Sequence, residues 1–169
     1  TWAADDDTDI EYMYQHLLDV NNTSILTPEQ IRDGWLHHIY SNEDAPNNEN
    51  FLWVSNETAY YLMQDGLLPP STSDPDNNSH YEMIDAQLTT EIFGLFAPTR
   101  PDIALRMAHL PIRTTAKDNA EWVAEFYVVM FALASYVDSE LNMKEKVFWL
   151  AEQARRRLPN GTPVAGMYD

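Results

Sequence analysis

The chain has no cysteine, few basic residues and only five glycines among its 169 residues. Without cysteine it has no disulfide bonds, thiolate catalysis or zinc–thiolate sites, although the redox compartment stays undecided. Only 10 Lys and Arg stand against 27 Asp and Glu, which leaves a formal net charge of −17. A field of that sign repels nucleic acid and anionic membrane surfaces, and it suits a divalent cation. So few glycines also exclude nucleotide-binding loops built from glycine runs.

The length and composition predict one domain over residues 1–169. At 44% hydrophobic and 12% aromatic residues, the chain is too apolar for intrinsic disorder despite its charge. No apolar run reaches the roughly 18 residues that a membrane-spanning helix needs. The first residue is Thr rather than Met and no signal peptide is present, so we expect a mature or trimmed product.

Five N-x-S/T sequons exceed the about one or two that the composition would produce by chance. The candidate glycosylation sites are Asn21, Asn22, Asn56, Asn77 and Asn160. Such acceptors belong to secreted surfaces, so we expect a secreted or extracellular protein. The alternative is a cytoplasmic protein from an organism rich in Asn that never glycosylates it. Asn56 falls within an expected helix and would need the outward face.

Helical patterns recur along the chain, and strand patterns hardly appear. Apolar residues at helical spacing predict the first helix from Asp7 to about Asn21. Thr27 followed by Pro28 and Gln30 forms a capping box, and Asn142 with Glu145 starts the last helix. The expected helices are 7–21, 27–41, 51–64, 81–93, 102–109, 115–137 and 142–157, with loops at 42–50 and 68–78. This pattern predicts an all-α, multi-helix bundle, with the apolar helix 115–137 at its centre.

The most informative segment is Asp5-Asp6-Asp7-Thr8, directly before the first helix. Three adjacent carboxylates repel one another unless a cation neutralises them, and a divalent ion with oxygen ligands does this well. The alternative is a solvated acidic helix start, in which Asp7 or Thr8 caps backbone N–H groups.

This segment also resembles the T-W-x-x-D-D-D-T motif of ADP-ribosylglycohydrolase family proteins, and further similarities follow in the same order. They are Tyr60 to Pro70 (helix and N-L-x-x-G-x-x-P-P turn), Asn78 to Gln87 (N-P-Y-x-E-x-I-G-A-Q), Phe93-Gly94 (aromatic-Gly), Pro101 to Ala104 (P-x-x-A) and Asn119 to Trp122 (N-G-x-Y). The collinear match covers nearly the whole chain.

The resemblance implies an all-α bundle with a binuclear magnesium centre that hydrolyses glycosidic bonds to ADP-ribose. Asp5, Asp6 and Asp7 match the first metal motif and are the implied Mg²⁺ ligands, whereas Thr8 would cap the helix and orient the carboxylates. The implied chemistry is attack of metal-activated water on an anomeric carbon of a small glycosidic or ADP-ribosyl substrate.

The chain departs from the family pattern at several positions. Asp85 replaces a Gly, Glu91 replaces an Asp, and Thr115-Ala116 replaces a Ser-His pair. The second metal motif, D-x-D-T, and an upstream Gly-rich segment are absent from these residues. We therefore expect the N-terminal part of a catalytic domain, with one half of a two-Mg²⁺ site. The remainder of the domain or a partner chain would complete the bundle.

Three further residues are candidates for function. Glu125 is the one charge in an apolar run, so it is expected to pair with an Arg or to line the cleft as a catalytic group. Asn119 and Trp122 are candidate substrate contacts, Trp122 through stacking on adenine. Asp9 and Glu11 are predicted to be solvated.

Two functional hypotheses remain open. One is a magnesium-dependent hydrolase of an ADP-ribosyl or related glycosidic bond. The other is a secreted, catalytically inactive structural or binding protein on the same helical scaffold. In neither case do we expect nucleic acid or membrane partners.

Overall fold

The computed structural model describes residues 5–39 and 52–169, and all regular structure in these two ranges is helical. The elements are α1 (Asp6–Val20), α2 (Pro28–His38), α3 (Val54–Gln64), the 3₁₀ turn η2 (Ser71–Ser73), α4 (Asp85–Thr89), α5 (Ile92–Phe96), α6 (Pro101–Thr115), α7 (Asn119–Leu133), α8 (Met143–Arg155) and α9 (Pro163–Tyr168). The expected all-α class is thereby confirmed. In the described ranges, no helix combines the length and the apolarity needed to cross a bilayer. The expected loop at 42–50 and the motif residues 1–4 lie outside the described residues.

Side-chain caps define where three of the long helices begin. The capping boxes predicted at Thr27 and Asn142 are both present, each with reciprocal side-chain and backbone hydrogen bonds. At α1 the cap is Asp5, whose Oδ1 accepts from the Thr8 backbone N–H at 3.1 Å. The prediction that Asp7 or Thr8 caps this helix is therefore wrong, because the Asp5 side chain already takes that N–H group.

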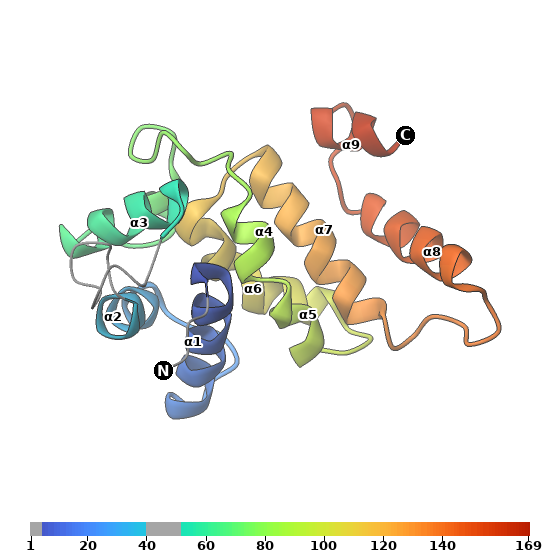
Figure 1. Ribbon diagram of the computed structural model, residues 1–169, viewed down its shortest axis with the longest axis horizontal. Coiled ribbons are helices and arrows are strands. Elements are labelled where there is room, and N and C mark those ends of the chain that lie inside the picture. The colour runs from blue at the N-terminus through green and yellow to red at the C-terminus, as the bar shows by residue number, and fades with distance from the viewer. Residues whose placement is uncertain (1–4, 40–51) are drawn as a thin grey trace.

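Helix α7 holds the bundle together. It packs against α4, α5 and α6 on one side and against α8 and α9 on the other, as Figure 1 shows. Its inner face consists of small residues, with Ala120, Ala124 and Val128 buried. Its outer face is only partly covered, and Phe131 is 37% exposed. The prediction that this helix lies at the centre of the bundle agrees with its contacts to five other helices, although one of its faces is only partly covered.

The other half of the core lies between α1, α2 and the short helix α5. Tyr14 is fully buried and accepts a hydrogen bond from Trp35 Nε1 at 3.1 Å. Its ring lies 5.6 Å from that of Phe93. These contacts fix the orientation of α1, and therefore of the carboxylates at its start.

Several helix boundaries differ from the prediction. The expected helix 81–93 is a series of turns followed by α4 and α5. Helix α6 runs to Thr115, beyond the expected end at 109, and includes Pro111. The short helix α9 has no counterpart in the prediction. At 81–93, packing against neighbouring helices decides the backbone conformation, and helical periodicity does not. Gly94, which follows directly, lies very close to α7.

Candidate metal centre

The start of α1 lies against the start of α3, and hydrogen bonds to Asp6 connect the two at this junction. Asp6 is only 1% exposed, and its Oδ2 accepts from the Trp53 backbone N–H at 2.7 Å and from Asn56 Nδ2 at 2.9 Å. Helix α3 has no side-chain cap of its own. The Asp6 carboxylate therefore accepts the backbone N–H of Trp53, the residue that caps the start of α3, together with the side-chain amide of Asn56.

Three more carboxylates surround this junction. Asp7 and Glu11 are one turn apart on α1, and Glu91 stands at the start of α5. Burial, and then the charges of Asp6, Asp5, Asp85 and Glu91, raise the pKa of Asp7 to about 7. Burial and then the charge of Glu91 raise the pKa of Glu11 to about 7, with Asp7 adding to this and the Ile92 backbone N–H opposing it. We call Asp5, Asp6, Asp7, Glu11, Asp85 and Glu91 the acidic centre.

Asp85, at the start of α4, is the member of the acidic centre that this helix contributes. Its side chain is 3% exposed, and its Oδ1 accepts from the Asn56 backbone N–H at 3.4 Å. Burial raises the pKa of Asp85 in spite of that bond. The position that resembles a family glycine thus carries a buried carboxylate beside Asp6 and Asp7.

The acidic centre has the donor chemistry of a hard-cation site. Asp7 Oδ1 and Glu91 Oε2 are buried and have no hydrogen-bond donor. Every charge that acts on the pKa of Asp7 is another carboxylate. Carboxylate oxygens are the ligands that Mg²⁺ prefers, and a bound cation would remove the repulsion among them. The acidic centre therefore offers the oxygen donors that Mg²⁺ prefers, although within the described residues the ligand atoms that converge within 4.8 Å of one another are those of His109, Glu121 and Glu125.

Asn119 lies at the first position of α7, next to a small cavity of about 220 Å³. The cavity is lined by residues 82–84, by Gln87 of α4 and by the start of α7. Asn119 Nδ2 donates to Glu82 Oε1 at 2.9 Å, and its Oδ1 is buried without a partner. Trp122 is partly buried on α7 and does not line this cavity.

Glu125 belongs to a different group of residues. Its carboxylate lies with His109 of α6 and Glu121 of α7, with all three ligand atoms within 4.8 Å of one another. Burial, followed by the charge of Glu121, raises the pKa of Glu125 to about 7. The structure therefore does not bring Glu125 together with the acidic centre.

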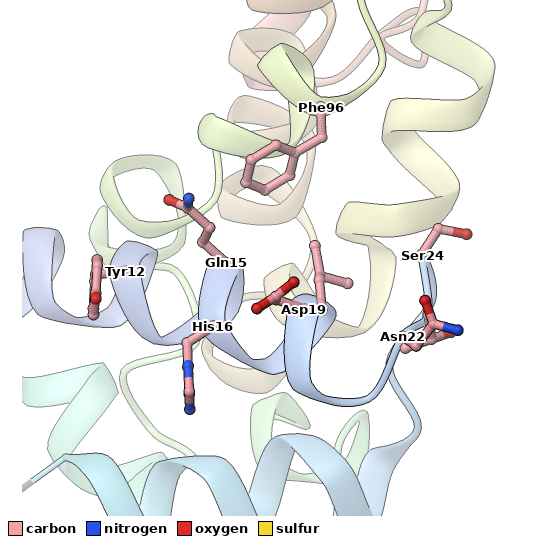
Figure 2. A pocket seen from close by; sticks show the side chains of 9 residues that line it. Tyr12, Gln15, His16, Asp19, Asn22, Ser24 and Phe96 are labelled. Atoms are coloured by element: carbon pink, nitrogen blue, oxygen red, sulfur yellow. The ribbon is translucent and has the colours of Figure 1, made fainter.

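A larger, open depression of about 720 Å³ follows the second half of α1 (Figure 2). Gln15 and Asp19 lie beneath the ring of Phe96 from α5, and His16 points toward α2. The His16 ring lies 5.1 Å from that of His38. None of the carboxylates of the acidic centre lines this depression, so it is separate from the candidate metal centre.

One of the five candidate glycosylation sites lies in the core. Asn56 is fully buried, and the amide nitrogen that a glycan would occupy donates to Asp6. Asn56 is therefore not available for a glycan in this fold. Asn21, Asn22, Asn77 and Asn160 are exposed, and their glycosylation stays a prediction.

Half of the acidic centre was not expected from the sequence. Glu11 was expected to be solvated, which is wrong, because it is half-buried against α5. Its position four residues after Asp7, on the same helix face, was the signal that could have identified it. Asp85 and Glu91 stood out only as departures from a family pattern, because nothing local in the sequence places them beside α1.

Comparison of the chain with protein-family models, with curated proteins and with solved structures finds no match.

Proposed function

We propose that this chain is part of a magnesium-dependent hydrolase that cleaves an ADP-ribosyl or related glycosidic bond. The observation that carries the proposal is the acidic centre, in which one buried oxygen each of Asp7 and Glu91 accepts no hydrogen bond. Repulsion among these carboxylates destabilises the fold when no cation is bound. A cation that binds there for function gives the arrangement a physical rationale. The motif resemblance of the chain supplies the reaction class.

The residues of the acidic centre take different roles in this proposal. Asp7, Glu11 and Glu91 offer oxygens to the ion, and Asp5 lies at the exposed edge. Asp6 accepts two hydrogen bonds through Oδ2, so it positions the start of α3, and its Oδ1 is the oxygen proposed as a ligand of the ion. When bound, Mg²⁺ would hold substrate hydroxyls and activate water. Thr8 is exposed on the first turn of α1, and its proposed role is to orient the neighbouring carboxylates.

The substrate would approach from the cavity beside Asn119. That cavity adjoins α4, and α4 also carries Asp85 of the acidic centre. Asn119 is the proposed polar contact to the substrate. Trp122, one turn further along α7, is the proposed stacking partner for a ring. A second carboxylate motif, from the rest of the domain or from a partner chain, is proposed to complete a two-magnesium site.

The test is Mg²⁺ binding by calorimetry, with release of ADP-ribose from modified peptides measured on the native full-length protein. We expect Asp7→Asn to weaken Mg²⁺ binding at least tenfold and to abolish turnover. Asp19→Asn is the matched control, because it makes the same change on an exposed part of the same helix. Equal Mg²⁺ binding by both variants would reject the acidic centre as the metal site.

The alternative is a secreted structural or binding protein without turnover. Exposed apolar side chains favour it, among them Phe131 on α7 and Phe148 on α8, which are 37% and 60% exposed. Such side chains form interfaces when a partner covers them. A full-length protein that binds no Mg²⁺ and releases no ADP-ribose would favour this alternative over the hydrolase.

A further inference from the structure

A second group of metal-ligating side chains lies between α6 and α7, and it shares no residue with the acidic centre. His109 comes from the middle of α6, and Glu121 and Glu125 are one turn apart on α7. The two helices pack against each other, so the imidazole faces both carboxylates across the helix pair. Because ligands from two elements converge, the group is more than an acidic surface patch.

The distances suit a small ion. The three ligand atoms lie within 4.8 Å of one another. Around a tetrahedral zinc ion with bonds of about 2.0–2.2 Å, neighbouring ligand atoms lie about 3.3–3.6 Å apart. Side-chain rotations that close the group by about 1.5 Å at most would therefore bring all three atoms to bonding distance.

Within the described residues, basic side chains form an ion pair with only one member of the group, Glu121. Arg113 donates to Ser73 Oγ at 3.1 Å and to Asp74 Oδ1 at 3.4 Å, and it also forms a longer ion pair with Glu121 at 3.8 Å. Lys117 Nζ likewise contacts Asp74 at 3.0 Å. Both cations thus make their shorter contacts with Ser73 or Asp74, and an ion at the group would compete with the Arg113–Glu121 pair alone. Within the described residues, Glu125 makes no ion pair, although it is partly buried.

We propose that His109, Glu121 and Glu125 form a binding site for a divalent transition-metal ion, and that zinc is the ion this ligand set favours. One imidazole nitrogen with two carboxylates suits zinc better than Mg²⁺, which prefers oxygen ligands alone. His109 is exposed, so the ion can enter from solvent. Three protein ligands leave the fourth position to water.

The bound ion would also join α6 to α7 at a partly buried position. It would relieve the repulsion between Glu121 and Glu125, and it would bind the native state only, because the unfolded chain does not bring His109 to them. Zinc is therefore expected to raise the midpoint of thermal unfolding as its concentration rises.

The experiment is a Zn²⁺ titration of the native protein in excess Mg²⁺, read by equilibrium dialysis and by thermal unfolding. Co²⁺ serves as a second probe, because its visible absorption increases when it enters a tetrahedral N/O site. We expect one Zn²⁺ per chain, and at least tenfold weaker binding in both His109→Ala and Glu125→Gln. Glu125→Gln keeps the side-chain volume and removes a partly buried charge, so the variant is expected to stay folded.

Two variants distinguish this site from the other candidate ligands. His37→Ala removes an imidazole that lies 4.6 Å from that of His38, outside the proposed site. Asp7→Asn alters the acidic centre. Both are expected to bind Zn²⁺ as the unaltered chain does. The proposal is overturned if the unaltered chain binds no Zn²⁺, or if His37→Ala or Asp7→Asn abolishes binding while Glu125→Gln retains it.

Discussion

At the scale of single residues, Asp6 and Asp7 are neighbours in sequence with different tasks. Asp6 points into the fold and accepts hydrogen bonds from Trp53 and Asn56, so its charge is used for structure. At Asp7, burial opposes ionisation most, followed by the charges of neighbouring carboxylates. A helix turns about 100° per residue, which sends adjacent side chains into different surroundings.

Replacing Asp6 by Ala is expected to destabilise the fold by about 2–4 kcal/mol. The change leaves the Trp53 N–H and the Asn56 amide without their charged acceptor in a buried location. Urea unfolding measures the loss, with Asp5→Ala as the exposed control, which is expected to cost about 1 kcal/mol through loss of the helix cap. A loss no larger than that of Asp5→Ala would contradict the structural role of Asp6.

Replacing Asp7 by Asn is expected to have the opposite effect on the metal-free protein. It removes a charge that burial and four carboxylates disfavour, so stability should rise by about 1 kcal/mol after allowance for the solvent that still reaches the group. Thermal unfolding without and with Mg²⁺ measures this. Without Mg²⁺, the variant should unfold at a higher temperature than the unaltered chain, and Mg²⁺ should raise its unfolding temperature less. A variant that unfolds at a lower temperature than the unaltered chain without Mg²⁺ would argue against charge repulsion at Asp7.

At the scale of elements, short helices position the acidic centre. Asp85 and Glu91 belong to the segment where one long helix was expected and where α4 and α5 form instead. Each is too short to be stable alone, so packing against α7 holds it in place. Gly94 in α5 allows this packing, because an added Cβ would lie 2.5 Å from the Val128 carbonyl oxygen and 2.6 Å from Phe131 Cβ.

Gly94→Ala is therefore expected to cost about 1–3 kcal/mol, because either α5 or α7 must shift to admit a methyl group. The matched control is Gly166→Ala in α9, where nothing lies within 4 Å of the added atom. That substitution should be neutral or stabilising by up to about 1 kcal/mol, owing to the higher helix propensity of Ala. Chemical unfolding of both variants gives the comparison, and equal costs would exclude tight α5–α7 packing.

At the scale of the whole molecule, charge opposes folding when no cation is bound. The chain carries 27 acidic residues, and three of them, Asp7, Glu11 and Glu125, have a pKa raised to about 7. In all three, burial is the first cause. These carboxyls bind protons more tightly in the folded state than in the unfolded chain, whose carboxyls titrate near pH 4.

The sign of the pH dependence follows from these shifts. Between about pH 4 and 7 the folded chain holds more protons than the unfolded chain, so stability decreases as pH rises through this range. We expect about 1–3 kcal/mol less stability at pH 8 than at pH 5.5, with partial solvent exposure taken into account. Thermal unfolding in metal-free buffer measures it. Mg²⁺ should stabilise the protein more at pH 8 than at pH 5.5, because protons no longer compete for the carboxylates. A metal-free protein that is more stable at pH 8 than at pH 5.5 would contradict the prediction.

Local sequence patterns were sufficient for the helical class, for two capping boxes and for the acidic start of α1. Helical periodicity and caps depend on residues within about one turn of each other, so one segment contains the needed information. The same patterns failed at residues 81–93, where the observed backbone follows contacts with α7 rather than its own periodicity.

The sequence by itself determined that this protein is helical, strongly acidic and equipped with three adjacent aspartates. Only the tertiary structure decided which carboxylates share a site, by bringing Asp85 and Glu91 to α1 while placing Glu125 with His109 on another face. The physical reason is that charge repulsion and metal coordination act over a few ångströms in space. Residues about 80 positions apart come that close only when the intervening helices have packed.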